Sequence, residues 1–178
     1  MQKNVATDSA ASVVDRELHA VYPEWVYPYS AGILGGLIGG LGVAVVGMSY
    51  GVYSGNVWLP VNLVAAAILR NLQSQPAPAI AQFDPAALIV GILIHAVMSA
   101  SLGLIFSFIL PALPGRPLYW GPVIGPLLWV GGYVAALPLL NPVMIRNLEI
   151  VSFTIANILF GILLGWWIDR TPMVKVER

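Results

Sequence analysis

Residues 29–55 read YSAGILGGLIGGLGVAVVGMSYGVYSG, an uncharged stretch that predicts a membrane-spanning helix. The hydrocarbon core of a bilayer is roughly 30 Å thick, and about 20 helical residues cross it. Gly32, Gly36 and Gly40 recur at a spacing of four, and Gly47 and Gly51 resume that spacing further along. Glycine is frequent in membrane helices generally. Stacked GxxxG pairs nevertheless favour a packing face, because close backbone approach drives helix association in lipid.

The composition of the whole chain is that of an integral membrane protein. Its 178 residues are 58% hydrophobic and only 9% charged, and the mean hydropathy is +0.84, whereas soluble domains are about 25% charged. The formal net charge is zero, which argues against a nucleic-acid partner. The absence of cysteine excludes disulfides, iron–sulfur clusters and thiol nucleophiles. Two histidines are too few for a three-histidine metal site within one chain.

We expect an all-α fold in which residues 29–170 form a four-helix bundle that spans the membrane. The predicted spans cover about residues 30–53, 85–110, 118–140 and 148–168. Residues 1–28 form a tail that ends in an aromatic segment typical of the bilayer interface, and residues 171–178 form a second tail. Prolines and glycines in the third span predict a kink or a local break there. The three prolines are Pro122, Pro126 and Pro138.

A short helix is expected between the first and second spans. Residues 57–70 are apolar but too few to cross a bilayer, and Arg70 closes the segment. Proline is favoured at the first position of a helix, which indicates a start near Pro60. The segment is interfacial or re-entrant, and both alternatives stay open.

Lysine and arginine are unevenly divided between the two sides of the predicted bundle. The side with the termini holds Lys3, Arg16, Arg116, Arg170, Lys175 and Arg178, and the opposite side holds Arg70 and Arg146. Cytoplasmic loops carry the excess of positive charge in membrane proteins. The distribution predicts a multi-pass protein with both termini in the cytoplasm.

Small residues at the same spacing of four indicate packing faces on the other spans as well. These predicted helix-packing positions are Gly91, Ser99, Gly103, Gly121, Gly125, Gly161 and Gly165. A weak internal repeat accompanies them. His95, Ser99 and Gly103 in the second span match Asn157, Gly161 and Gly165 in the fourth, and LPVN (59–62) matches LPLLN (137–141). The pattern suggests two similar helix pairs.

His95 is the ionisable residue of greatest interest, because it falls near the middle of the second span. An ionisable group at this depth can act as a haem ligand, a proton relay or a quinone contact. We favour the alternative, a neutral histidine that donates a hydrogen bond to a neighbouring helix. A haem held by this chain alone would need a second ligand, and His19 lies in the tail. We therefore expect no cofactor on this chain alone, bound lipid, and haem or quinone only at a shared interface.

The remaining polar residues have local explanations. Glu149 begins the fourth span and is expected to pair in part with Arg146. Asp84 precedes Pro85 and predicts a helix N-cap. Asn62 and Asn141 follow prolines and fit turn positions. No motif of a known catalytic site is present, so the chain is not expected to be an enzyme, although it can belong to an enzyme complex.

Several stretches resemble small, uncharacterised four-span proteins of bacterial inner membranes. They are GGLIGG (35–40), YGVYSGNVWLPVNLVAAAI (50–68), GILIHAVMSASLGLIF (91–106) and LNPVM (140–144). The resemblance implies a location in the bacterial inner (cytoplasmic) membrane. It also implies an accessory subunit of a respiratory electron-transport complex, of the haem-copper oxidase or quinol:cytochrome c oxidoreductase type.

Together these features predict a non-catalytic accessory subunit of a multi-subunit membrane complex. Its expected partners are other membrane subunits and lipids. The alternative is a small homo-oligomeric transporter or channel with His95 lining the path.

Overall fold

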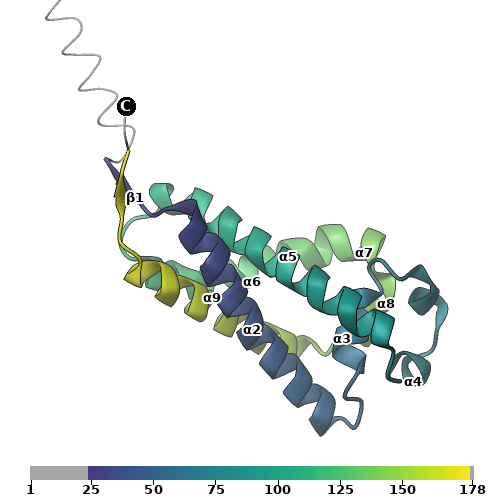
Figure 1. The fold of residues 1–178 in the computed structure, drawn as a ribbon. Helices are drawn as coiled ribbons and strands as arrows, with labels where there is room; N and C mark the ends of the chain where they lie inside the picture. The colour runs from purple at the N-terminus through teal and green to yellow at the C-terminus, as the bar shows by residue number, and fades with distance from the viewer. Residues whose placement is uncertain (1–23, 177–178) are drawn as a thin grey trace, which may run out of the picture.

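The computed structural model describes residues 24–176 of the chain (Figure 1). Four helices in it are long and apolar enough to cross a membrane. They are α2 (Tyr29–Tyr53), α5 (Pro85–Ile109) with the turn η2 (Leu110–Ala112), α6 (Pro117–Gly131) continued by η3 (Gly132–Ala136) and α7 (Leu137–Leu140), and α9 (Ile150–Arg170). The predicted all-α fold with four long apolar helices is confirmed. Residues 1–23 of the first predicted tail, His19 included, and residues 177–178 of the second lie outside the described residues.

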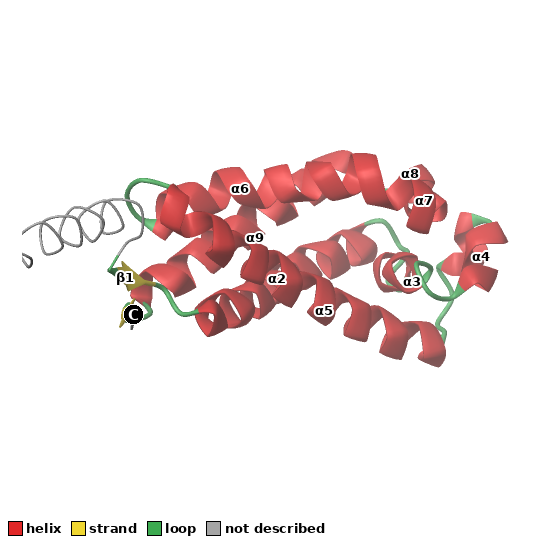
Figure 2. Ribbon diagram, turned by 90° about the horizontal axis from the view of Figure 1, so that it is seen from above, coloured by secondary structure: helices red, strands yellow, loops and turns green. Residues whose placement is uncertain are grey.

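The long helices pack side by side in the order α5, α2, α9, α6. At the end that carries the chain termini they share one core. Phe106 of α5, Phe160 and Leu164 of α9 and Ala31 of α2 are buried in it, and Trp120 of α6 packs against it. Toward the opposite end α5 and α6 diverge (Figure 2). The bundle is therefore closed by long helices at one end only.

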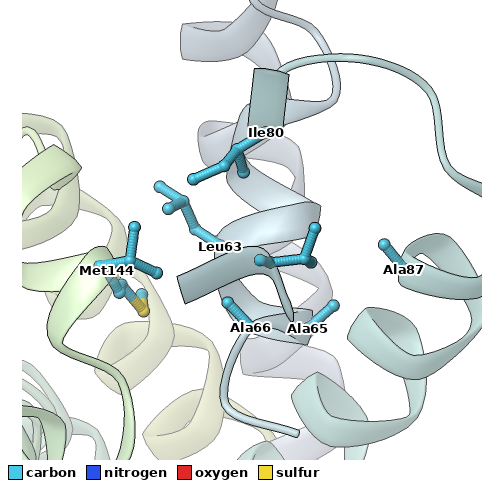
Figure 3. Packing of buried hydrophobic residues seen from close by; sticks show 8 residues of the cluster. Leu63, Ala65, Ala66, Ile80, Ala87 and Met144 are labelled. Carbon is cyan, nitrogen blue, oxygen red and sulfur yellow. The ribbon is translucent and has the colours of Figure 1, made fainter. Parts of the chain in front are cut away.

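Four short helices fill the diverging end. They are α3 (Leu59–Ala65), η1 (Arg70–Ser74), α4 (Ala77–Ile80) and α8 (Pro142–Asn147). Leu63, Ala66 and Ile80 form a second core with Ala87 of α5 and Met144 of α8 (Figure 3). This part of the chain covers apolar residues of α5, α7 and α9, among them Val90, Leu137 and Phe153.

The short helix predicted near Pro60 is α3, which begins at Leu59 with a proline in its first turn. It lies against α5, where a Cβ atom added to Gly91 would be 2.6 Å from the Val61 carbonyl oxygen. Gly91 is about 9 Å along α5 from Pro85, at 1.5 Å of rise per residue. The helix α3 is thus packed beside the ends of the long helices and does not stand beyond them.

The irregularity predicted in the third span falls late in it. The α-helix continues through Pro122 and Pro126, and a π-helical turn follows at Gly132–Ala136, just before Pro138. Proline supplies no backbone N–H and crowds the preceding turn. Local π-type adjustments of this kind re-pair backbone groups that a proline leaves free.

The two ends of the described chain meet at the same end of the bundle (Figure 1). The strand β1 (Trp25–Val26) pairs antiparallel with β2 (Val174–Lys175). An ion pair of 3.0 Å between the Lys175 ammonium and the Glu24 carboxylate supports this ribbon. The segments that precede the first span and follow the last are therefore tied together.

Candidate functional site

His95 joins the two neighbouring helices α5 and α2. Its Nε2 atom lies 2.7 Å from the carbonyl oxygen of Gly40, and the side chain is half-buried. A carbonyl oxygen only accepts hydrogen bonds, so Nε2 carries the proton and donates it. In the neutral imidazole the remaining lone pair then belongs to Nδ1. His95 is thus placed as an interhelical hydrogen-bond donor.

The glycine stripe of α2 makes this bond geometrically possible. A Cβ atom added to Gly40 would collide with the hydroxyl of Ser99, which is buried one turn from His95. One added to Gly36 would collide with the Ser99 carbonyl oxygen, and one added to Gly103 with the Gly32 carbonyl oxygen. The backbones of α2 and α5 approach so closely that no side chain larger than a hydrogen atom fits at these glycine positions.

A second glycine face on α2 contacts α9 and was not among the packing positions predicted from the sequence. Cβ atoms added to Gly35 and Gly39 would come within 2.9 Å of Leu164 and 2.8 Å of Phe160, respectively. Gly42 would meet Leu163 at 2.6 Å. Gly35 and Gly39 share the spacing of four, which is the signal that could have identified this face. Two packed faces thus place α2 between α5 and α9.

The pair α6 and α9 repeats the close contact of α2 and α5. A Cβ atom added to Gly121 would collide with the Gly161 carbonyl oxygen, and one added to Gly125 would lie 2.8 Å from the Asn157 carbonyl oxygen. A Cβ atom added to Gly165 would likewise lie 2.7 Å from the Pro117 carbonyl oxygen. The Asn157 side chain donates to the Phe153 carbonyl of its own helix, at 2.8 Å. It therefore lies at the packed interface without bridging it.

Helices α5 and α2 form one antiparallel pair, and α9 and α6 form another. Equivalent positions of the suggested repeat meet in the two pairs. The positions that meet His95, Ser99 and Gly103 are Gly40, Gly36 and Gly32, and those that meet Asn157, Gly161 and Gly165 are Gly125, Gly121 and Pro117. In the row α5, α2, α9, α6 the second pair lies beside the first. The helix of the second span and the helix of the fourth span each come first in their pair.

Other predicted packing positions have different surroundings. Gly47 has only Pro60 within 4 Å of an added Cβ atom, at 3.9 Å, which is ordinary van der Waals contact. Gly51 and Gly91 contact the segment between the first two spans and not another long helix. Gly131 and Gly132, in the third span, have no atom of the described chain within 4 Å of an added Cβ. Close glycine packing is thus confined to part of the bundle.

The acidic residues at helix starts are caps. Glu149 accepts from the backbone N–H groups of Val151 at 3.0 Å and Ser152 at 2.6 Å. Hydrogen bonds from Ser152 and then from the Val151 backbone hold the pKa of the Glu149 carboxyl below its usual value. The expected partial pairing with Arg146 is wrong, because Arg146 reaches away and donates to the Gln73 carbonyl oxygen, at 3.2 Å. Glu149 is therefore a structural group at the helix start.

Asp84 has the same role at the start of α5. Its carboxylate accepts from the backbone N–H groups of Ala86 at 2.8 Å and Ala87 at 3.2 Å. These bonds satisfy donors that the first turn of a helix leaves without intrahelical partners.

Two buried asparagines fasten the short helices to one another, a role that turn chemistry alone did not predict. Asn62 donates to the carbonyl oxygens of Ile80 at 2.6 Å and Gln82 at 2.8 Å. Asn141 donates to the Leu63 carbonyl at 2.6 Å and caps α8 by accepting from the Met144 N–H at 3.3 Å. The four bonds supply partners for backbone groups in the end turns of the short helices and in the turn after α4.

Arg70 and Gln73 complete this network at the end of the third span. Both side chains donate to the Leu140 carbonyl oxygen, at 3.1 Å and 2.9 Å. The carbonyls of a last helical turn have no intrahelical donors, and a cation there is favoured by the helix dipole. Arg70, expected only to close an apolar segment, thus helps to anchor that segment to α7.

The described residues offer no group of three histidine, cysteine, aspartate or glutamate side chains that could hold a metal ion. Comparison of the chain with protein-family models, curated proteins and solved structures gives no match. The function is therefore inferred from the geometry.

Proposed function

We propose that this chain is a multi-pass membrane subunit without catalytic residues, which packs against other membrane chains of a larger complex. The supporting observation concerns the last part of the third span, residues 131–140. No residue of η3 or α7 is buried within the chain, and Gly131 and Gly132 present bare backbone to open space. A second membrane helix would cover this surface with the same kind of glycine contact that joins α2 to α5.

The polar groups within the long helices support a structural role. His95 is committed to the Gly40 carbonyl, and Asn157 and Thr154 donate to carbonyls of their own helix. A transport path needs polar groups that face a water-filled space. These side chains instead form hydrogen bonds within the chain.

The distribution of charge supports the proposed orientation. Arg116, Arg170 and Lys175 lie at the end that carries the β1–β2 ribbon, whereas Arg70 and Arg146 lie at the opposite end. We place the ribbon on the cytoplasmic side of a bacterial inner membrane, following the positive-inside rule. The host complex that the sequence resemblance implies is a respiratory electron-transfer complex.

Site-specific photocrosslinking tests the proposed contact surface. A photoreactive residue replaces Val134 of η3, which is 68% exposed, or Leu41 of α2, which is 67% exposed. In native membranes we expect Val134 to crosslink to a different protein in a discrete band, and Leu41 to give no comparable band. A Val134 crosslink to a second copy of this chain would contradict the subunit proposal and favour a homo-oligomeric transporter. Equal, weak labelling at both positions would show that lipid alone covers the third span.

A further inference from the structure

The last turn of α9 contains a hollow lined by Trp166, Trp167, Arg170 and Thr171, with a volume of about 180 Å³. The guanidinium of Arg170 lies over the Trp166 ring, 4.6 Å from its centroid. The centroids of the Trp166 and Trp167 rings are 6.5 Å apart. Stacking on an aromatic ring holds a guanidinium in a fixed plane while leaving its N–H edges available to a ligand.

Arg170 differs in its surroundings from the other cations at this end of the described chain. Arg116 holds the Asp169 carboxylate through two hydrogen bonds, of 3.1 Å and 2.6 Å, and Lys175 pairs with Glu24 at 3.0 Å. Among residues 24–176, no carboxylate forms a salt bridge with Arg170. The carboxylate of Asp169, the residue before Arg170 in the chain, is already paired with Arg116. The positive charge of Arg170 is therefore available to an external anion.

The polar groups that the hollow offers to a ligand are donors. The guanidinium of Arg170 only donates, whereas the indole N–H of Trp167 is shielded from the surface, with its edge of the ring against Gly35 of α2, and is not counted as a ligand contact. The Thr171 hydroxyl already donates to the Trp167 carbonyl oxygen, at 3.0 Å. The ligand that suits this hollow is therefore an anion with several acceptor oxygens, which describes a phosphate group.

We propose that Arg170 binds the phosphate group of an anionic membrane lipid, in the hollow that Trp166 and Trp167 line beside it. The proposal rests on the proposed membrane insertion, which sets the last turn of α9 at headgroup depth, where tryptophan rings and arginine are enriched. Phosphate oxygens would accept from the guanidinium, and the Trp166 ring would contact the glycerol and upper acyl region. Anionic lipids of the cytoplasmic leaflet attract basic residues at this depth.

Native mass spectrometry of lipids retained by the full chain tests the site. The protein is taken from bilayers with equal amounts of phosphatidylglycerol and phosphatidylcholine, and the ratio of the two retained lipids is measured. We expect Arg170→Gln to lower the ratio about fivefold, in line with one charge–lipid contact, and Arg170→Lys to restore part of it. Lys175→Gln removes the same charge outside the hollow and should leave the ratio unchanged.

Several results would overturn the site. An equal loss in Lys175→Gln would show general attraction to the membrane surface, and an unchanged ratio in Arg170→Gln would show that Arg170 does not bind lipid phosphate. Inorganic phosphate that displaces phosphatidylglycerol at equal concentration would assign the hollow to free phosphate. A chain that enters bilayers but retains the two lipids equally would contradict this site alone. A chain that fails to enter bilayers would contradict the proposed function as well.

Discussion

His95 of α5 donates a hydrogen bond to the carbonyl oxygen of Gly40 on α2, with 2.7 Å between the Nε2 and oxygen atoms. The bond connects two backbones that glycine and serine allow to lie in close contact. A buried carbonyl that already belongs to a helix gains a second donor, and the histidine gains a fixed tautomer. The ionisable residue in the middle of the second span is therefore part of the packing between helices.

Replacing His95 should weaken the bundle. His95→Ala removes the interhelical hydrogen bond, and we expect the free energy of unfolding to fall by about 0.5–2 kcal/mol, the range for such bonds between membrane helices. His95→Gln keeps an N–H donor of similar reach and should recover part of the loss. Thermal unfolding in mild detergent measures both variants. Stabilities equal to that of the unmodified chain would show that the bond contributes nothing.

Alanine at two glycines of the third span should have opposite consequences. Gly121→Ala places a methyl group against the Gly161 carbonyl oxygen, so the helices must separate, and we expect a loss above about 2 kcal/mol or a failure to fold. Gly131→Ala meets open space and removes a flexible residue from a helix, which should be neutral or stabilising by up to about 1 kcal/mol.

The same unfolding assay compares the two alanine variants directly. Equal stabilities for Gly121→Ala and Gly131→Ala would contradict the close contact between α6 and α9.

Asn62 should hold the segment between the first two spans. Asn62→Ala leaves the Ile80 and Gln82 carbonyls without their donors, at a cost of about 1–3 kcal/mol for buried groups. We expect local opening, which limited trypsin digestion would detect as faster cleavage after Arg70. Asn56→Ala is the control, because the Asn56 side chain donates to the nearby Ser54 carbonyl oxygen and not to a distant segment. Cleavage at the same rate in both variants would mean that Asn62 does not hold this segment.

Glu149 should make stability depend on pH in acid. Hydrogen bonds from Ser152 and Val151 hold the pKa of the Glu149 carboxyl below its ordinary value. A lowered pKa in the folded state stabilises the protein above the unfolded value, and this contribution is lost as the pH falls through the folded value. Below about pH 4.5 the unmodified chain should therefore lose more stability than Glu149→Gln. Parallel pH profiles for the two proteins would contradict this assignment.

The fold class was predictable because it depends on long apolar stretches, which are a local property of sequence. The same holds for Asp84, whose cap geometry follows from an aspartate before proline. The arrangement of the helices depends on contacts between distant residues. The hydrogen bond from Arg146 to the Gln73 carbonyl oxygen was missed for this reason. The spacing of Gly35 and Gly39 indicates a packing face, but only the fold identifies α9 as the helix that covers it. For His95, the residue type and depth predicted an interhelical bond, but only the fold identifies its acceptor as Gly40.

The central claim is that this chain serves as a packing subunit of a larger membrane complex. Its most direct test is affinity purification of the full chain from native membranes in mild detergent, with mass spectrometry and an optical spectrum of the same sample. We predict stoichiometric recovery of other membrane chains, with the absorption bands of haem if the host is a respiratory complex. A colourless species that contains only copies of this chain would contradict the claim.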